Sequence, residues 1–194
     1  MAVVLGLGNP GARYARTRHN VGVRVLETLV ARWRASAREA VPEYRWWQAE
    51  RAGRAVSLVQ PLTYMNASGA ALAAFETEHG LDPKLLVVTD DVYLSFGLLR
   101  IRARGSSGGH RGLESIEAAL GTREYARLRI GVGAASTSAE LREHVLEELT
   151  EVEEQELQAA VMLAADAVEH WLVEGLLAAM NRFNRKVGKE VPES

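Results

Sequence analysis

The sequence predicts an α/β fold: a single three-layer domain in which helices flank a mixed β-sheet. Short apolar runs alternate along the chain with segments in which apolar residues recur at helical spacing. Residues 44–52 and 54–59 form two strand-like runs around Gly53, a hairpin signal, so the sheet is not wholly parallel. A length of 194 residues with 47% apolar residues suits one domain with a sizeable core. We expect this domain to span residues 1–194, with a frayed tail after about residue 185.

The individual elements follow from local patterns. Residues 21–33 carry apolar side chains at helical spacing, and Asn20 stands where a helix N-cap belongs. Asn66 or Ser68 is expected to cap a later helix, and Pro61 to stop the strand before it. The predicted strands are 3–7, 44–52, 54–59, 84–89, 98–103 and 127–132, and the predicted helices are 21–33, 68–80, 113–120, 138–148 and 151–184.

Composition narrows the class of protein. The chain contains no cysteine, which excludes a disulfide framework and a thiolate metal site. It shows no leading basic-plus-apolar signal segment and no apolar run long enough to span a bilayer. We therefore expect a cytoplasmic protein that does not contact a membrane.

Charge is unevenly distributed, although the net charge is only −2. Residues 1–54 carry ten Arg and four acids, and residues 98–129 carry seven Arg and three acids. Residues 138–174, in contrast, carry eleven acids and one Arg. Because Arg binds phosphate through a bidentate fork, a polyanion that meets the first two-thirds of the chain is one explanation. Arginines spread over a solvated surface are the other.

The glycine-rich run after the first predicted strand has the spacing Gly6-x-Gly8-x-x-Gly11, which matches a dinucleotide-binding fingerprint. That motif requires a helix to open within the glycine run, so that its N-terminus meets the pyrophosphate. Pro10 disfavours a helical residue before it, and the apolar helical spacing begins only at Val21. We interpret the match as chance.

The same stretch contains candidates for a catalytic or binding site. Ligands in α/β proteins bind at the carboxyl ends of strands, where this stretch places Asn9, His19 and Asn20. His19 lies just before a predicted helix, whose positive end should lower the imidazole pKa. The ring would then stay neutral, as a general base requires.

Two acids, Asp90 and Asp91, follow the strand predicted at 84–89. Paired carboxylates at this position are compatible with a hard metal ion, but no third carboxylate lies nearby in the sequence. We therefore expect no metal, and we interpret the acids as a source of a carboxylate that orients a histidine.

Arginines and glycines dominate the segment that follows. Alternate residues of two predicted strands are arginines, which gives each strand a basic stripe on one face: Arg100, Arg102 and Arg104 on the first, Arg127 and Arg129 on the second. Between them, the glycine-rich residues 105–112 allow close approach of the backbone to a ligand.

Four segments together resemble the bacterial peptidyl-tRNA hydrolase family. They are Gly-Leu-Gly-Asn-Pro-Gly-Ala-Arg-Tyr with Thr-Arg-His-Asn-Val-Gly (6–22), Pro-Leu-Thr-Tyr-Met-Asn-Ala-Ser-Gly (61–69), Asp-Asp with Phe-Gly (90–97), and Gly-Gly-His with Arg-Leu-Arg-Ile-Gly (108–131). Each motif alone is weak, but the four occur in the family's order and spacing over about residues 2–184. The resemblance implies a monomeric esterase that needs neither metal nor cofactor. Its substrate would be a peptide joined by an ester to the 3′ adenosine of a tRNA.

The resemblance also assigns roles to individual residues. His19 matches the catalytic histidine, Asp90 the carboxylate that orients it, and Asn9 and Asn66 the asparagines that line the peptide and ester site. Other substrate-site positions match Tyr14, Asn20, Met65, His110 and Arg111, and the basic contacts to tRNA match Arg100, Arg102, and Arg127 or Arg129. The segment 134–148 is expected to be mobile and, with residues 105–112, to flank the crevice.

The chain departs from the family pattern at four positions. Arg111 stands where the family usually has Asn, and it could bind a phosphate instead. Gln60 replaces a lysine, Thr89 a histidine, and Tyr93 an acid.

Three rival functions remain open from the sequence. The first is a non-catalytic RNA-binding relative on the same fold, similar to an organellar splicing factor. The second is a nucleotide-dependent oxidoreductase, which rests on the glycine spacing. The third is a serine hydrolase that uses Ser106 or Ser107, although no nucleophile-elbow sequence surrounds either residue.

Overall fold

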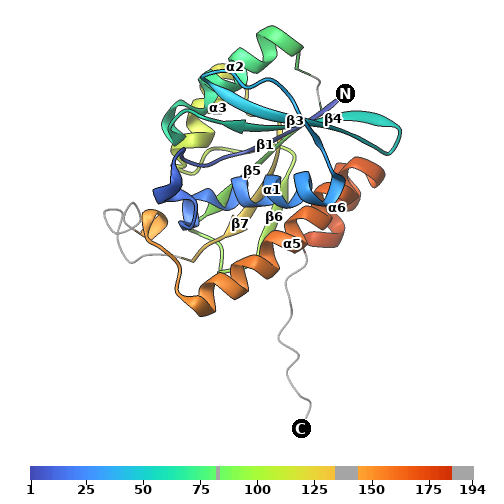
Figure 1. Cartoon of the computed structure of the whole chain (residues 1–194). Helices are drawn as coiled ribbons and strands as arrows, with labels where there is room; N and C mark the ends of the chain where they lie inside the picture. The colour runs from blue at the N-terminus through green and yellow to red at the C-terminus, as the bar shows by residue number, and fades with distance from the viewer. Residues whose placement is uncertain (82–83, 134–143, 185–194) are drawn as a thin grey trace.

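One seven-stranded mixed sheet forms the centre of the computed structural model, which describes residues 1–81, 84–133 and 144–184 (Figure 1). The spatial order of the strands is β2-β3-β4-β1-β5-β7-β6. Their bounds are β1 Ala2–Gly6, β2 Ser36–Ala37, β3 Tyr44–Arg51, β4 Arg54–Pro61, β5 Leu85–Asp91, β6 Leu99–Arg102 and β7 Ala126–Gly131. This confirms the predicted α/β class and the mixed sheet.

The four central strands β4, β1, β5 and β7 run parallel, and β2, β3 and β6 pair antiparallel at the edges. The predicted hairpin around Gly53 is confirmed as β3 and β4. Pro61 still pairs with Tyr44, so the proline is the last residue of β4 and does not stop the strand before it. Because the parallel strands share a direction, their carboxyl ends meet at one edge of the sheet.

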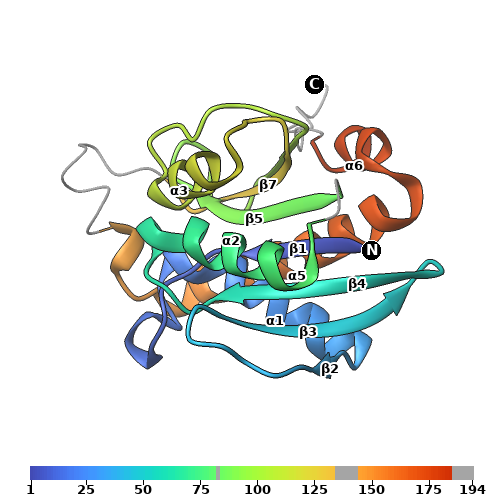
Figure 2. The same ribbon diagram turned by 90° about the horizontal axis from the view of Figure 1, so that it is seen from above.

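Helices cover both faces of the sheet (Figures 1 and 2). On one face lie α1 (Val21–Trp33), α5 (Glu151–Glu174) and α6 (Leu176–Phe183); on the other lie α2 (Ser68–His79) and α3 (Arg111–Leu120). Two hydrophobic clusters result, one between the sheet and each helical layer. The adjacent Trp46 and Trp47 pack against different clusters, as alternating side chains of a strand must.

Three helix predictions need correction or restriction. The helix predicted at 151–184 is two helices, because Gly175 adopts a left-handed φ of 88° that breaks the hydrogen-bond ladder. Neither Asn66 nor Ser68 caps α2, whose N-cap is Ala67. Of the helix predicted at 138–148, residues 144–146 are helical, and residues 138–143 lie outside the described part of the chain, as does the predicted tail.

The glycine run serves packing between β1 and α1. A Cβ on Gly6 would lie 2.5 Å from the carbonyl oxygen of Gly22, and one on Gly22 would lie 2.4 Å from the carbonyl oxygen of Val88. The glycines therefore let α1 approach the strands closely. A three-residue 3-10 helix, Ala12–Tyr14, follows Gly11, but the first α-helix begins only at Val21, so no α-helix opens within the run, as the sequence indicated.

Ion pairs within the fold neutralise part of the charge that is unevenly distributed along the sequence. Arginines of α1 and of the turn before it pair with acids of α5: Arg18 with Glu153, Arg24 with Glu154 and Arg32 with Asp166. The acidic C-terminal segment thus neutralises part of the basic N-terminal one. None of the helices that the structure describes has both the length and the apolar character that a bilayer crossing requires.

Candidate active site

The site lies where β1, β4 and β5 end and α3 begins. The loop after β1 contains the short 3-10 turn Arg18–Asn20, which carries His19. Asp90 is the penultimate residue of β5, and His110 is the N-cap of α3. Chain segments far apart in sequence therefore converge at the carboxyl edge of the sheet, where α/β proteins bind ligands.

His19 and Asp90 are in direct contact. The His19 Nδ1 atom lies 3.0 Å from each carboxylate oxygen of Asp90. Because Nδ1 must donate its proton to the carboxylate, Nε2 of the neutral ring keeps a free lone pair. The carboxylate fixes the tautomer and orientation that a general base needs.

The pKa of His19 moves opposite to the prediction from the helix dipole. Burial lowers the pKa of this imidazole, but the charge and the hydrogen bond of Asp90 together outweigh it, so the pKa lies above its ordinary value. For Asp90, burial raises the pKa of the carboxyl, but the charges and hydrogen bonds of two histidines lower it by more. The pKa therefore lies below its ordinary value, and the group stays ionised. The contact with a buried carboxylate is stronger than the effect of a helix end.

His110 is the second histidine bound to Asp90. Its Nδ1 accepts a hydrogen bond from the backbone N–H of Leu113 at 3.2 Å, which places the ring proton on Nε2. That Nε2 lies 2.9 Å from Asp90 Oδ1 and 2.9 Å from the hydroxyl of Thr89. The contact of His110 with substrate stays a prediction; in the structure both of its ring nitrogens are engaged within the protein.

The atoms of His19, Asp90 and His110 that meet here are close enough to raise the question of a metal. Each of the two histidine nitrogens lies 2.9–3.0 Å from Asp90 Oδ1, which is a hydrogen-bond distance. A metal ion would need each ligand atom at about 2.0–2.2 Å from itself and both facing nitrogens unprotonated. The Leu113 contact puts a proton on the His110 nitrogen that faces Asp90, so the donor set fits a hydrogen-bonded cluster and not a metal centre.

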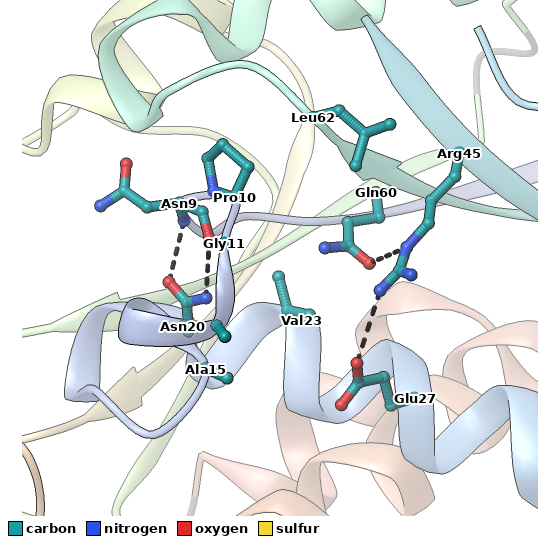
Figure 3. Close-up of a pocket in the computed structure, with 11 residues that line it drawn as sticks. Asn9, Pro10, Gly11, Ala15, Asn20, Val23, Glu27, Arg45, Gln60 and Leu62 are labelled. Carbon is teal, nitrogen blue, oxygen red and sulfur yellow. Dashed lines mark hydrogen bonds and ion pairs between the residues drawn. The ribbon is translucent and has the colours of Figure 1, made fainter. Parts of the chain in front are cut away.

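A second polar group holds Asn9 (Figure 3). The Asn20 carboxamide binds both main-chain atoms of Asn9: its oxygen accepts from the Asn9 N–H at 2.8 Å and its NH₂ donates to the Asn9 carbonyl at 2.9 Å. The Asn9 side-chain oxygen accepts from the backbone N–H of Met65 at 2.9 Å. The Asn9 NH₂ group has no partner among the described residues and can donate to a ligand. Asn20 is the N-cap residue of α1 as predicted, but its side chain binds Asn9 and not the first turn of the helix.

Gly112 joins the two polar groups. A Cβ at this position would lie 2.5 Å from Met65 Sδ and 3.0 Å from the His110 ring. Met65 and His110 thus adjoin each other across a glycine, and the asparagine group borders the histidine cluster. Any side chain at residue 112 would displace one of the two.

Beside Asn9 and Asn20 lies a cavity of about 300 Å³, lined also by Val23, Arg45 and Gln60. Arg45 donates to Gln60 at 2.7 Å and faces Glu27 at 3.6 Å. Figure 3 shows that the Asn9 carboxamide points away from Val23, Gln60 and Arg45. The cavity therefore borders the asparagine pair without containing the donor group of Asn9.

Three expected site residues are accessible. Asn66 and Arg111 are exposed, and Tyr14 is half-buried with the guanidinium of Arg13 over its ring. Neither Asn66 nor Arg111 has a side-chain partner among the described residues, which leaves both available to a ligand.

The predicted basic residues divide into two classes. Arg127 is buried, bonded to Glu117 and packed over the Tyr125 ring, so its side chain is unavailable to tRNA in this structure. Arg129 pairs with Asp91 at 3.1 Å. Arg100 and Arg102 lie on the neighbouring strand β6, directly opposite Arg129 and Arg127.

Sequence reasoning missed the roles of Arg18 and Thr89. Arg18 is a buried cation one residue before His19, and Thr89 contributes its hydroxyl to the histidine cluster. The only available signal was their position beside His19 and Asp90, which does not reveal partners distant in sequence.

A histidine whose one ring nitrogen is held by a buried carboxylate, beside side-chain amides at the edge of an α/β sheet, is an arrangement that hydrolases with a general base use. The family model described as peptidyl-tRNA hydrolase matches residues 3–191. This chain therefore belongs to the peptidyl-tRNA hydrolase family.

Individual relatives agree with this assignment. A peptidyl-tRNA hydrolase of Chloroflexus aggregans is 46% identical over 186 residues, which cover 95% of this chain and 99% of the relative. One from Symbiobacterium thermophilum is 42% identical over 189 residues, covering 94% and 98%. The crystal structure of peptidyl-tRNA hydrolase from Acinetobacter baumannii superimposes with a TM-score of 0.87 at 31% identity, covering 95% of this chain and 94% of that one.

Proposed function

We propose that this chain hydrolyses the ester that joins a peptide, or an N-blocked amino acid, to the 3′ end of tRNA, with His19 as the general base. The observation that carries the proposal is the 3.0 Å contact of His19 Nδ1 with the buried Asp90 carboxylate. It leaves Nε2 free to take a proton from water as that water attacks the ester carbonyl.

The reaction requires little more than a positioned general base and a hydrogen-bond donor to the oxyanion. The ester is already reactive, because its leaving group is a ribose hydroxyl beside a second hydroxyl. General-base assistance by His19 contributes roughly 10²–10⁴ in rate. The free NH₂ of Asn9, or that of Asn66, would stabilise the oxyanion, worth about 10²–10³ for each donor. Asp90 stabilises the imidazolium that forms on His19.

The sheet order supports an orientation for the substrate. Asn9 and Met65 follow β1 and β4, whereas Arg129 and Arg100 lie on β7 and β6 at the other side of β5. We place the acyl part at the asparagines, where amide groups bind a peptide backbone without regard to its side chains. The acceptor stem and the 3′ end lie toward β6 and β7, where Arg binds phosphate without reading bases. Arg111 provides a further candidate for a phosphate contact.

The proposed unit is a single chain, because His19, Asp90, His110 and Asn9 all come from one copy. Peptidyl-tRNA arises where ribosomes translate, so we place the activity in the cytoplasm.

The proposal is tested by hydrolysis of N-acetylaminoacyl-tRNA by the wild-type chain and by His19→Ala. We expect the variant to lose roughly 10²–10⁴ in kcat while its affinity for deacylated tRNA stays within about twofold. His170→Ala, on α5 away from the site, is the matched control and should retain full activity. A wild-type chain that binds tRNA but releases no acyl group would instead identify the non-catalytic RNA-binding relative.

The pH dependence of kcat/KM tests the His–Asp pair. The neutral form of His19 is the active one, and its pKa is raised, so activity should fall as the pH drops below that raised pKa. Asp90→Asn removes the charge that raises the pKa of His19, so the acid limb should move to lower pH while kcat falls. An unmoved acid limb in Asp90→Asn would show that another group controls the reaction.

A further inference from the structure

Tyr93 is an exposed aromatic residue next to the active site that the mechanism does not use. Its exposed fraction is 70%. Isolated exposed apolar side chains are ordinary in proteins, so exposure alone indicates nothing. Tyr93, however, follows Asp90 by three residues, which limits the distance between their Cα atoms to roughly 11 Å.

The loop that carries Tyr93 is tied down. The Tyr93 N–H donates to the Asp91 carboxylate at 2.8 Å. Further along, the Gly97 N–H donates to the Gly131 carbonyl at 2.9 Å, and a Cβ on Gly131 would lie only 2.0 Å from the Ser95 carbonyl oxygen. The loop thus packs directly on the end of β7. The backbone that carries the ring is therefore already ordered, and it loses little conformational freedom when the ring binds a ligand.

Positive charge lies on the same side of the site. Asp91, which holds the Tyr93 backbone, also pairs with Arg129 of β7, and Arg100 of β6 lies in register with Arg129. Proteins bind single-stranded nucleic acid by combining cations that follow the backbone with aromatic rings on which bases stack. Tyr93 supplies a ring on the loop that Asp91 links to Arg129. Asp91 balances the charge of Arg129, so Arg100 is the arginine of this pair that has no acid partner among the described residues.

The other exposed tyrosine near the site, Tyr64, provides a contrast. Its exposed fraction is 55%, and it precedes Met65 in the segment after β4. In the sheet order, β4 lies on the opposite side of β1 from β5, β7 and β6. Tyr64 therefore lies on the side of the asparagines, away from the cationic strands.

We propose that Tyr93 is a stacking platform for a base in the single-stranded 3′ end of the tRNA substrate. The inference rests on the proposed function for the identity of the nucleic acid. The ester must reach His19, so the last nucleotides pass within reach of the loop that follows Asp90. The occupant of this subsite is a nucleobase, and the subsite tolerates any base because each has a π-face.

Steady-state hydrolysis of N-acetylaminoacyl-tRNA gives the first test. Tyr93→Ala should raise KM about tenfold with little change in kcat, since base stacking is worth about 1–3 kcal/mol. Tyr93→Phe keeps the ring and should behave as wild type. Leu177→Ala on α6, with a matching exposed fraction of 71%, controls for the loss of exposed apolar surface and should also behave as wild type. A Tyr93→Phe variant as impaired as Tyr93→Ala would overturn stacking in favour of a hydroxyl contact.

Binding without turnover gives the second test and separates this inference from the catalytic proposal. Wild type should bind deacylated tRNA with a complete 3′ end about tenfold more tightly than tRNA shortened by its last three nucleotides. Tyr93→Ala should lose this difference and leave the salt dependence of binding unchanged, because a neutral ring releases no counterions. If the chain hydrolyses the ester but Tyr93→Ala keeps the full difference, the stacking subsite is wrong. If the chain hydrolyses nothing, but wild type binds the complete tRNA more tightly than the shortened one and Tyr93→Ala does not, the stacking subsite stands and the catalytic proposal fails.

Discussion

Two groups of arginines in this protein differ in whether they form ion pairs with acids. Arg18, Arg24 and Arg32, at the α1–α5 interface, each pair with an acid of α5. Arg100 and Arg102, on β6, have no ion-pair partner among the residues that the structure describes. Both groups come from segments that look equally basic in the sequence.

The strand pair explains why the β6 arginines are left without acids. Arg100 lies opposite Arg129 and Arg102 opposite Arg127, and like charges in such pairs repel each other. On β7 the charges are compensated, since Asp91 binds Arg129 and Glu117 binds Arg127. The β6 arginines face partners whose acids are already engaged, so an anion from outside is the group that would balance them.

The comparison teaches that net charge along the sequence does not locate a polyanion site. Three of the ten arginines in residues 1–54 are paired with acids of a helix that lies more than a hundred residues later in the chain. Substitutions of the arginines at the α1–α5 interface should therefore change folding stability. Substitutions of the arginines on β6 should change substrate binding.

The largest expected effect on folding stability comes from Arg18. Its side chain is 6% exposed and contacts Glu153 at 2.6 Å, with a further hydrogen bond to the carbonyl of His144. Arg18→Met should lower the free energy of unfolding by about 2 kcal/mol, less than for a fully buried pair because Glu153 is 30% exposed and regains water. Urea unfolding followed by circular dichroism measures this. A loss below about 0.5 kcal/mol, the usual range for a surface substitution, would show that the interface is not held by its charges.

A smaller effect, and one on binding alone, is expected at Arg102. Arg102→Ala should weaken tRNA binding about threefold to tenfold and flatten the dependence of log K on log salt by about one unit, as the loss of one phosphate contact does. Arg100→Ala should act in the same direction. Filter binding between 50 and 200 mM salt, a range of about fourfold in ionic strength, gives the slope. Unfolding free energies equal to wild type would confirm that neither residue serves the fold, whereas an unchanged salt slope in both variants would move the RNA face elsewhere.

Local patterns were sufficient for most of the fold. The prediction of α1 at 21–33 is correct because its apolar spacing is regular and most of its apolar face packs into the hydrophobic cluster that the sheet shares with α5. The hairpin at Gly53 needs only residues adjacent in sequence. The split at Gly175 was missed because apolar spacing continues on both sides of it, and a single glycine breaks a helix only when its φ becomes positive.

The contact between His19 and Asp90 could be predicted from the family resemblance, and the structure confirms that the two side chains meet. Other contacts around them could not be predicted from the sequence. The sequence pattern placed Asn20 correctly at the N-cap of α1 but did not show that the Asn20 side chain binds Asn9, because that contact depends on how the loop folds back. Nor did it show that Arg127 is buried, since alternation on a strand places a residue on a face without revealing what covers that face.

The smallest expected effect on folding stability is that of Arg32→Ala, and this variant gives the clearest comparison between the two groups of arginines. Arg32 pairs with Asp166, whose side chain is 54% exposed, so the charge of Arg32→Ala is lost at a largely hydrated site. We expect a stability loss under about 1 kcal/mol, similar to other exposed ion pairs. Arg32→Ala and Arg102→Ala would then both fold almost as well as wild type while removing the same charge. Only Arg102→Ala should flatten the salt dependence of tRNA binding, because the Arg32 charge is already balanced within the protein. Equal flattening in both variants would mean that tRNA responds to the overall charge of the protein and not to the unpaired arginines of β6.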